Sequence, residues 1–159
     1  MRERRWAACF HAFGPEARGA ASRGDVVVSD EPLDYPVSRE VGVLVALTQD
    51  APDRHAPRRE PGGTLGADLM RVCQLPAGDY RSCGVEIYRA VQEAMGTEQV
   101  GDVAALRVIS ALVGVVSAGA LAEVVRHRFR GPARPQNLRA VEVGPEVGRW
   151  TLARDGEAP

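Results

Sequence analysis

Lysine is absent from this sequence of 159 residues, and all 20 of its basic residues are arginine. The two residues bind their partners differently, but at many exposed sites either one serves, so function alone would not remove every lysine. A GC-rich genome, whose codons favour Arg, Ala, Gly and Pro, explains the bias more simply. Aromatic residues are also scarce, at 5%, so a hydrophobic core has to be built from Val, Leu and Ala.

A strong net charge is missing as well. The formal charge of −1 provides no general electrostatic field for nucleic acids or anionic membranes. The three cysteines, Cys9, Cys73 and Cys83, are an odd number and imply no complete disulfide framework. This count favours free thiols in a reducing cytoplasm.

The sequence contains no familiar catalytic or metal-binding motif. Cys9 and His11 are separated by one residue, and neither their spacing nor that of Cys73 and Cys83 matches a zinc site. Phosphate-binding loops, dinucleotide fingerprints and nucleophile elbows are all missing. We therefore expect a non-enzymatic protein with no catalytic residue, no cofactor and no metal.

Residues 1–63 are rich in Gly, Pro and charge, and they predict a poorly ordered N-terminal region. Within it, Trp6, Phe10 and Phe13 would share one face of a short amphipathic helix. The apolar run 41–47 fits either a buried strand or a short buried helix, and its β-branched residues favour a strand.

Residues 64–130 carry the helical signals. Thr64 could cap a first helix and Ser82 a second one that ends at Gly96. Asp102 would then cap a long helix reaching about Phe129, which has no charged residue between 108 and 122. The predicted fold class is mainly α: a small helical bundle around one long apolar helix.

The remaining residues, 131–159, form a tail in which two short apolar runs flank a Gly/Pro turn. This pattern could form a C-terminal β-hairpin. The predicted domains are therefore 1–63, 64–130 and 131–159.

The central apolar segment has three interpretations. As a membrane span, its 15 uncharged residues would rise only about 22 Å against a hydrocarbon layer of roughly 30 Å. As a helix–helix interface, it presents Ser110, Gly114 and Ala118 at a four-residue spacing that allows close approach. As an ordinary core helix, it would be buried within one domain. The last two are compatible and preferred, and a membrane anchor over 103–125 is the alternative.

A basic turn follows this segment. Arg126, Arg128 and Arg130 could bind an anion, with Phe129 among them. The simpler interpretation is a solvated helix end whose charges complement the helix dipole.

Residues 85–128 resemble part of the C-terminal half of TetR-family transcriptional regulators. The resemblance consists of a helix ending in Met95-Gly96, a short polar connector, and a long helix rich in Ala, Leu and Val. It implies a segment for ligand binding and dimerisation. Residues 1–63 contain no helix-turn-helix pattern, so DNA binding is not implied.

Together these observations predict a cytoplasmic, non-enzymatic homodimer. It would be a TetR-like remnant with an unidentified small-molecule effector and no nucleic-acid partner. Association with a membrane is the alternative.

Overall fold

The computed structural model describes residues 6–13, 22–33, 39–144 and 151–154, the last range by its backbone alone. These residues belong to two compact units, 1–41 and 42–159. The division therefore differs from the predicted boundaries at residues 63 and 130.

The first unit contains an antiparallel pair of strands, β1 (Trp6–Phe13) and β2 (Ser22–Ser29). Trp6 lies opposite Ser29, and Cys9 lies opposite Val26. The amphipathic helix predicted here is wrong, because strand pairing gives this segment a two-residue period instead of a helical one.

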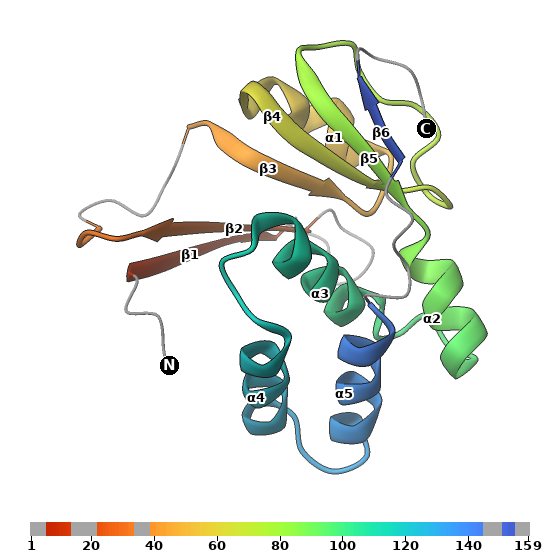
Figure 1. The fold of residues 1–159 in the computed structure, drawn as a ribbon. Coiled ribbons are helices and arrows are strands. Elements are labelled where there is room, and N and C mark those ends of the chain that lie inside the picture. Colours follow the sequence, from red (N-terminus) through yellow and green to blue (C-terminus); the bar gives the residue numbers. More distant parts are fainter. Residues whose placement is uncertain (1–5, 14–21, 34–38, 145–150, 155–159) are drawn as a thin grey trace. The chain divides into compact units, whose positions relative to one another are not determined.

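The second unit is built on a four-stranded sheet in the order β3-β4-β5-β6 (Figure 1). Strands β4 and β5 are parallel, and β5 and β6 are antiparallel. The bounds are β3 Val41–Ala46, β4 Arg59–Asp68, β5 Tyr80–Val85 and β6 Thr151–Arg154. Strand β3 coincides with the strand expected over 41–47, and α1 (Asp50–His55) with the short 3-10 turn η1 (Ala56–Arg58) connects it to β4.

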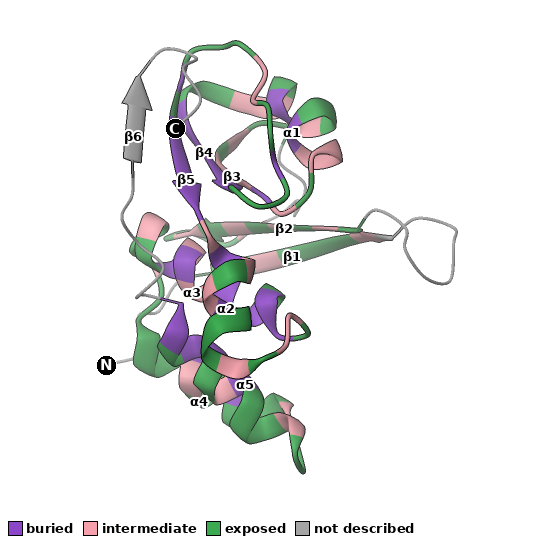
Figure 2. Cartoon of the chain, turned by 90° about the vertical axis from the view of Figure 1, so that its right-hand side faces the viewer, coloured by how far each residue is buried: buried purple, intermediate pink, exposed green. Residues whose placement is uncertain are grey.

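Four helices complete this unit: α2 Ile87–Met95, α3 Gly101–Val113, α4 Ala118–Arg128 and α5 Ala133–Val143. Helix α5 contacts α2, α3 and α4. Their core is built almost entirely from small aliphatic side chains, including Val91, Ala104 and Val108, as the shortage of aromatic residues predicts. Figure 2 shows that β4 and β5 are also buried over most of their length.

The fold is therefore α/β, and the mainly α prediction is wrong. Thr64 and Leu65 lie in β4, where they pair with Arg81 and Ser82 of β5 instead of starting a helix. Apolar residues near 64–72 fit a helical spacing, but burial between two neighbouring strands overrides that local pattern.

The long apolar helix is wrong as well, because the chain breaks it into α3 and α4. Gly114 adopts φ +70° and ends α3, a conformation that glycine reaches without steric cost. Ser117 then caps α4, its hydroxyl accepting a 3.1 Å hydrogen bond from the Ala120 amide. No helix in the described ranges is long and apolar enough to cross a membrane.

The predicted C-terminal hairpin is wrong, since helix α5 occupies residues 133–143. Strand β6 pairs with β5, so the last described strand joins the main sheet.

Candidate functional site

The candidate site lies at the carboxyl end of β4. Ligands of open α/β sheets bind beyond the carboxyl ends of the parallel strands, which makes this edge the place to look. Three segments meet there: the residues after β3, the loop 69–79 after β4, and the first turn of α2.

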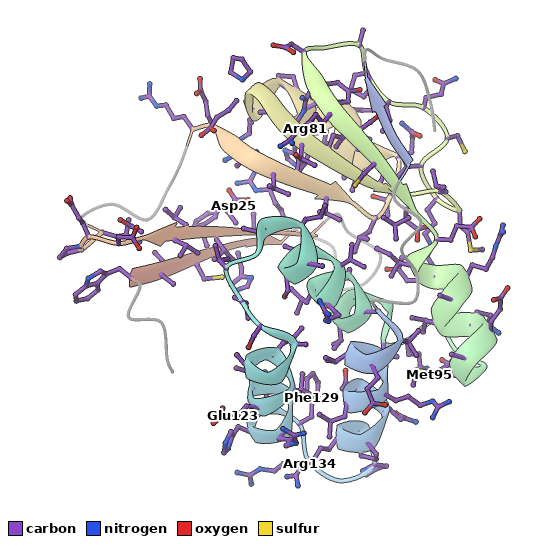
Figure 3. All side chains as sticks on the ribbon, in the orientation of Figure 1. Asp25, Arg81, Met95, Glu123, Phe129 and Arg134 are labelled. Carbon is purple, nitrogen blue, oxygen red and sulfur yellow. The ribbon has the colours of Figure 1, made fainter. Side chains whose placement is uncertain are left out.

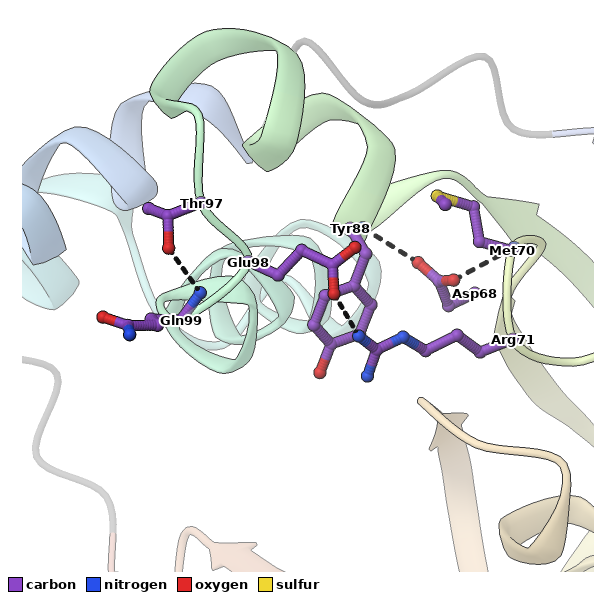
Figure 4. Close-up of polar contacts among 7 residues, drawn as sticks. All are labelled: Asp68, Met70, Arg71, Tyr88, Thr97, Glu98 and Gln99. Carbon is purple, nitrogen blue, oxygen red and sulfur yellow. Dashed lines mark hydrogen bonds and ion pairs between the residues drawn. The ribbon is translucent and has the colours of Figure 1, made fainter.

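Asp68, the last residue of β4, ties two of these segments together. Its side chain is fully buried. One carboxylate oxygen accepts a hydrogen bond from the Met70 amide at 3.0 Å, and the other accepts one from the Tyr88 amide at 3.1 Å (Figure 4). Tyr88 lies in the first turn of α2, so the carboxylate also faces the positive end of that helix dipole. Asp68 thus fixes the loop against the helix.

Arg71 and Tyr88 lie beside Asp68, Arg71 exposed and Tyr88 half-buried. The guanidinium carbon of Arg71 lies 3.5 Å from the centre of the Tyr88 ring, and Arg71 Nη2 lies 2.5 Å from Glu98 Oε2 (Figure 4). Burial raises the pKa of Tyr88, the nearby carboxylates raise it further, and Arg71 opposes them. Tyr88 therefore stays a neutral phenol at neutral pH.

The Tyr88 ring also packs closely on the start of α3. A Cβ atom added to Gly101 would collide with Cε1 of the ring. Because glycine has no Cβ, the ring fits between the start of α3 and the Arg71 guanidinium.

Gln49, which follows β3, holds the middle of the loop. Its side-chain oxygen accepts hydrogen bonds from the amides of Cys73 and Gln74, at 2.9 and 3.1 Å. Its side-chain nitrogen donates to the Gln74 carbonyl at 2.9 Å and to Asp53 at 3.1 Å. One side chain therefore satisfies three backbone groups of the loop.

Tyr80 holds the far end of the loop. Its hydroxyl donates a hydrogen bond to the Pro76 carbonyl, and the guanidinium carbon of Arg59 lies 3.8 Å from its ring centre. Burial raises the pKa of Tyr80 and lowers that of Arg59, while each partner's charge opposes the effect on the other.

The loop thus presents a fixed surface rather than a reactive group. Leu69 and Met70 are 39% and 45% exposed beside the Arg71–Tyr88 pair. Methionine, aromatic and arginine side chains are enriched in protein–protein interfaces.

Reactive constellations are not found in the described part of the chain. No group of three or more metal-ligating side chains occurs there. Cys83 is buried in β5, and burial raises the pKa of its thiol to about 11, so it stays protonated at neutral pH. Cys9 Sγ lies 3.2 Å from His11 Nε2 on the exposed side of β1, but no third ligand joins them within the described ranges.

The three predicted interface residues do not share one helix. Ser110 is buried in α3, where its hydroxyl donates to the Leu106 carbonyl at 2.8 Å. Gly114 ends α3, and Ala118 begins α4. Their contact with another chain stays a prediction, although the continuous stripe on which it was based is broken.

The predicted anion-binding arginines lie at the end of α4. Arg126 and Arg128 are exposed in its last turn, and Arg130 is exposed just beyond it. The side chain of Phe129 points between α4 and α5, and its carbonyl accepts a 2.9 Å hydrogen bond from Arg134 Nε (Figure 3). Anion binding at these arginines stays a prediction.

Sequence reasoning missed Asp68, Gln49 and the Arg71–Tyr88 pair. Asp68 follows the run Thr64–Ala67, so a strand ending in a carboxylate was a usable signal. The helical interpretation of that run concealed it. Gln49 carried no comparable local signal, because its partners lie 24 and 25 residues away.

These features define an α/β protein that holds a structured loop at the carboxyl edge of a partly parallel sheet. The family model of pyruvate ferredoxin/flavodoxin oxidoreductase matches residues 1–147. The chain belongs to this family.

Individual relatives support the family assignment. The chain is 30% identical to the 2-oxoglutarate synthase subunit KorC of Methanothermobacter marburgensis, over 86% of this chain and 76% of that subunit. It superposes with a TM-score of 0.77, at 30% identity, on the gamma subunit of a keto/oxoacid ferredoxin oxidoreductase from Geobacter sulfurreducens, over 90% of this chain and 78% of that one.

A longer protein shares the fold. A 2-oxoglutarate:ferredoxin oxidoreductase from Magnetococcus marinus, with 2-oxoglutarate, coenzyme A and succinyl-CoA bound, matches with a TM-score of 0.76 at 20% identity. The match covers 95% of this chain but 28% of that one.

The comparisons correct four predictions. The resemblance of residues 85–128 to TetR regulators is wrong, because the family match spans 1–147. The expectation of a non-enzymatic protein is wrong, because the relatives are subunits of oxidoreductases. For the same reason the lone effector-binding homodimer and the membrane anchor over 103–125 are wrong. Both relatives are named as subunits.

Proposed function

We propose that this chain is the gamma-type subunit of a 2-oxoacid:ferredoxin oxidoreductase whose substrate is 2-oxoglutarate. The observation that carries the proposal is the agreement, over nearly the whole chain, between the family match and the fold of a separate gamma subunit. The substrate follows from the name of the KorC relative.

The reaction of the assembled enzyme would be an oxidative decarboxylation. The bond between C1 and C2 of 2-oxoglutarate breaks and releases carbon dioxide. The remaining acyl carbon is oxidised and forms a thioester with coenzyme A. The two electrons reduce two ferredoxins, and one proton is released. Ferredoxin is a one-electron acceptor found in the cytoplasm, where we place the complex.

In such a complex this chain would have a structural role and would bind neighbouring subunits. The described residues contain no cluster of three or more potential metal ligands, and the one thiol buried in the sheet, Cys83, is held protonated by its raised pKa. The chain instead offers the loop 69–79, fixed by Asp68 and Gln49, with Leu69 and Met70 exposed on it. A rigid loop of this kind loses little conformational entropy on binding a neighbouring subunit.

The test is purification of the affinity-tagged chain from its native cells, followed by an activity assay of the material obtained. We expect additional subunits to co-purify in a fixed ratio. The mixture should reduce ferredoxin only when 2-oxoglutarate and coenzyme A are both present, and succinyl-CoA should form.

Pyruvate and 2-ketoisovalerate, supplied in place of 2-oxoglutarate, are the controls for substrate choice. Faster reduction with either one would assign a different 2-oxoacid to the same enzyme class. A tagged chain that co-purifies with no 2-oxoacid-dependent activity would contradict the proposal itself.

A further inference from the structure

The end of helix α4 and the start of α5 carry a concentration of positive charge that the rest of the chain does not share. Residues 124–141 contain five arginines and one histidine, and no aspartate or glutamate. All 21 acidic residues of the chain lie outside this stretch, together with the other 15 of its 20 arginines. A GC-rich genome favours arginine over lysine, but it does not remove aspartate and glutamate from one stretch. The codon bias therefore leaves this separation of charge unexplained.

Four of these residues lie around the connection between the two helices, and we call them the arginine cluster: Arg126, Arg128, Arg130 and Arg134. Helices α4 and α5 contact each other. Arg134 Nε donates a 2.9 Å hydrogen bond to the carbonyl of Phe129, so the Arg134 side chain reaches back from α5 to the end of α4 (Figure 3). Phe129 stands between Arg128 and Arg130 in the chain. The hydrogen bond therefore brings a third arginine beside these two.

The arginine cluster has no carboxylate partner among the described residues, which distinguishes it from other exposed arginines. Arg54 pairs with Asp50 at 2.6 Å, and Arg89 pairs with Glu86 at 2.7 Å. All four arginines of the cluster are exposed, and the group that Arg134 bonds is a neutral carbonyl. A guanidinium carries five N–H donors, so the cluster keeps most of its donors available for a ligand.

The helix dipoles explain only half of this arrangement. The negative end of α4 stabilises Arg126 and Arg128 in its last turn. Arg134 instead lies in the first turn of α5, which contains no acidic residue. A cation is unfavourable at this positive end of a helix dipole, where anions bind. A bound anion would offset this unfavourable interaction and the mutual repulsion of the arginines.

We propose that the arginine cluster binds a phosphate anion with at least two negative charges, such as a diphosphate. Guanidinium groups donate paired hydrogen bonds in a planar fork that matches the oxygens of phosphate. A single carboxylate has only two oxygens and one charge to share among the arginines, whereas a diphosphate presents charged oxygens to several of them at once. The site uses α4 and α5 and no residue of the loop 69–79, so it stands independently of the proposed function.

Isothermal titration calorimetry of the full chain with inorganic pyrophosphate tests this site, at low ionic strength and without divalent cations. We expect one pyrophosphate to bind per chain. The double variant Arg128→Gln/Arg130→Gln should lower the affinity at least tenfold. The double variant Arg54→Gln/Arg89→Gln removes the same charge from two exposed arginines of α1 and α2, and it should leave the affinity unchanged. Both should melt near the wild-type temperature, because exposed side chains contribute little to stability.

Two further measurements locate the site and its ligand. In amide NMR spectra of the chain, we expect pyrophosphate to shift the resonances of residues 126–134 more than those of β5. Uridine diphosphate, supplied in place of pyrophosphate, distinguishes two sources of the same anion. Tighter binding of the nucleotide assigns the site to a nucleoside diphosphate, and equal or weaker binding assigns it to free diphosphate.

Three results would overturn the inference. The first is the absence of any binding of pyrophosphate or the nucleotide to the wild-type chain. The second is an equal loss of affinity in the two double variants, because it shows a diffuse attraction to positive charge. The third is a set of shifted amide resonances that lies outside residues 124–141, which places the anion elsewhere. None of these results bears on the proposed oxidoreductase activity, which is tested separately.

Discussion

Asp68 places a carboxylate in the interior of the second unit, where it accepts hydrogen bonds from the amides of Met70 and Tyr88. Removing the side chain leaves two partly buried amide donors without this partner, and each costs about 1–2 kcal/mol because water reaches part of the site. We expect Asp68→Ala to lower the free energy of unfolding by about 2–4 kcal/mol, measured by urea denaturation.

The matched control for this prediction is Asp50→Ala. Asp50 is about half exposed and bonds Arg54 at 2.6 Å within α1, so its loss should cost less than about 1 kcal/mol. Equal effects of the two substitutions would show that the buried carboxylate has no special role in holding the loop.

Cys83 should make the free energy of unfolding depend on pH in the alkaline range. Burial raises its pKa from 9.0 to about 11, so between these values the folded protein keeps a proton that the unfolded chain has lost. The stability associated with the neutral, buried thiol is fully present below pH 9. As the pH rises from 9 to 11, the free energy of unfolding falls by on the order of 2 kcal/mol.

The measurement compares unfolding of the wild type and Cys83→Ala across this range. The stability advantage of the wild type should shrink as the pH rises from 9 to 11. Cys73→Ala, at an exposed cysteine, provides the control. A constant difference between wild type and Cys83→Ala would rule out a buried, neutral thiol.

At the scale of elements, residues 101–128 form two helices, α3 and α4, where the sequence predicted one continuous helix. Gly114 adopts φ +70°, which strains any residue with a Cβ. Gly114→Ala should therefore destabilise the protein by about 1 kcal/mol or more. In a continuous helix the same change would stabilise it by a similar amount.

The sign of the change in melting temperature decides between these descriptions. Gly114→Asn is the control, because asparagine tolerates this backbone region better than alanine and should lose less stability. A higher melting temperature for Gly114→Ala than for the wild type would instead support one continuous helix.

Some elements could be predicted because their signals are local. Gly96 ends α2 with φ +69°, as its position after an apolar helix face indicates. The β-branched run 41–47 formed β3. By contrast, the helical spacing of Leu65, Leu69 and Val72 was misleading, because β5 supplied the partner that made 59–68 a strand.

At the scale of the whole molecule, the two units should differ in stability. The first consists, where described, of the β1–β2 pair, and two-stranded ribbons alone are marginal in water. The second has a sheet and four packed helices. In the free chain, the amides of Trp6–Phe13 and Ser22–Ser29 should therefore exchange at least tenfold faster than those of Tyr80–Val85.

Mass spectrometry of exchanged peptides from the free chain would measure this difference. The helix α3, which packs against α5, gives a second slow reference within the same sample. Equal protection of the two units would mean that they unfold as one cooperative body.

The sequence by itself determined the aliphatic composition of the core, the strand at 41–47 and the end of α2, because each depends on composition or on neighbours within a few residues. The tertiary structure alone decided that 59–68 is a strand, that α5 replaces a hairpin, and that Asp68, Gln49 and Tyr88 meet at one edge. The physical reason is distance along the chain: Asp68 and Tyr88 lie 20 residues apart, and only the pairing of β4 with β5 brings them into contact.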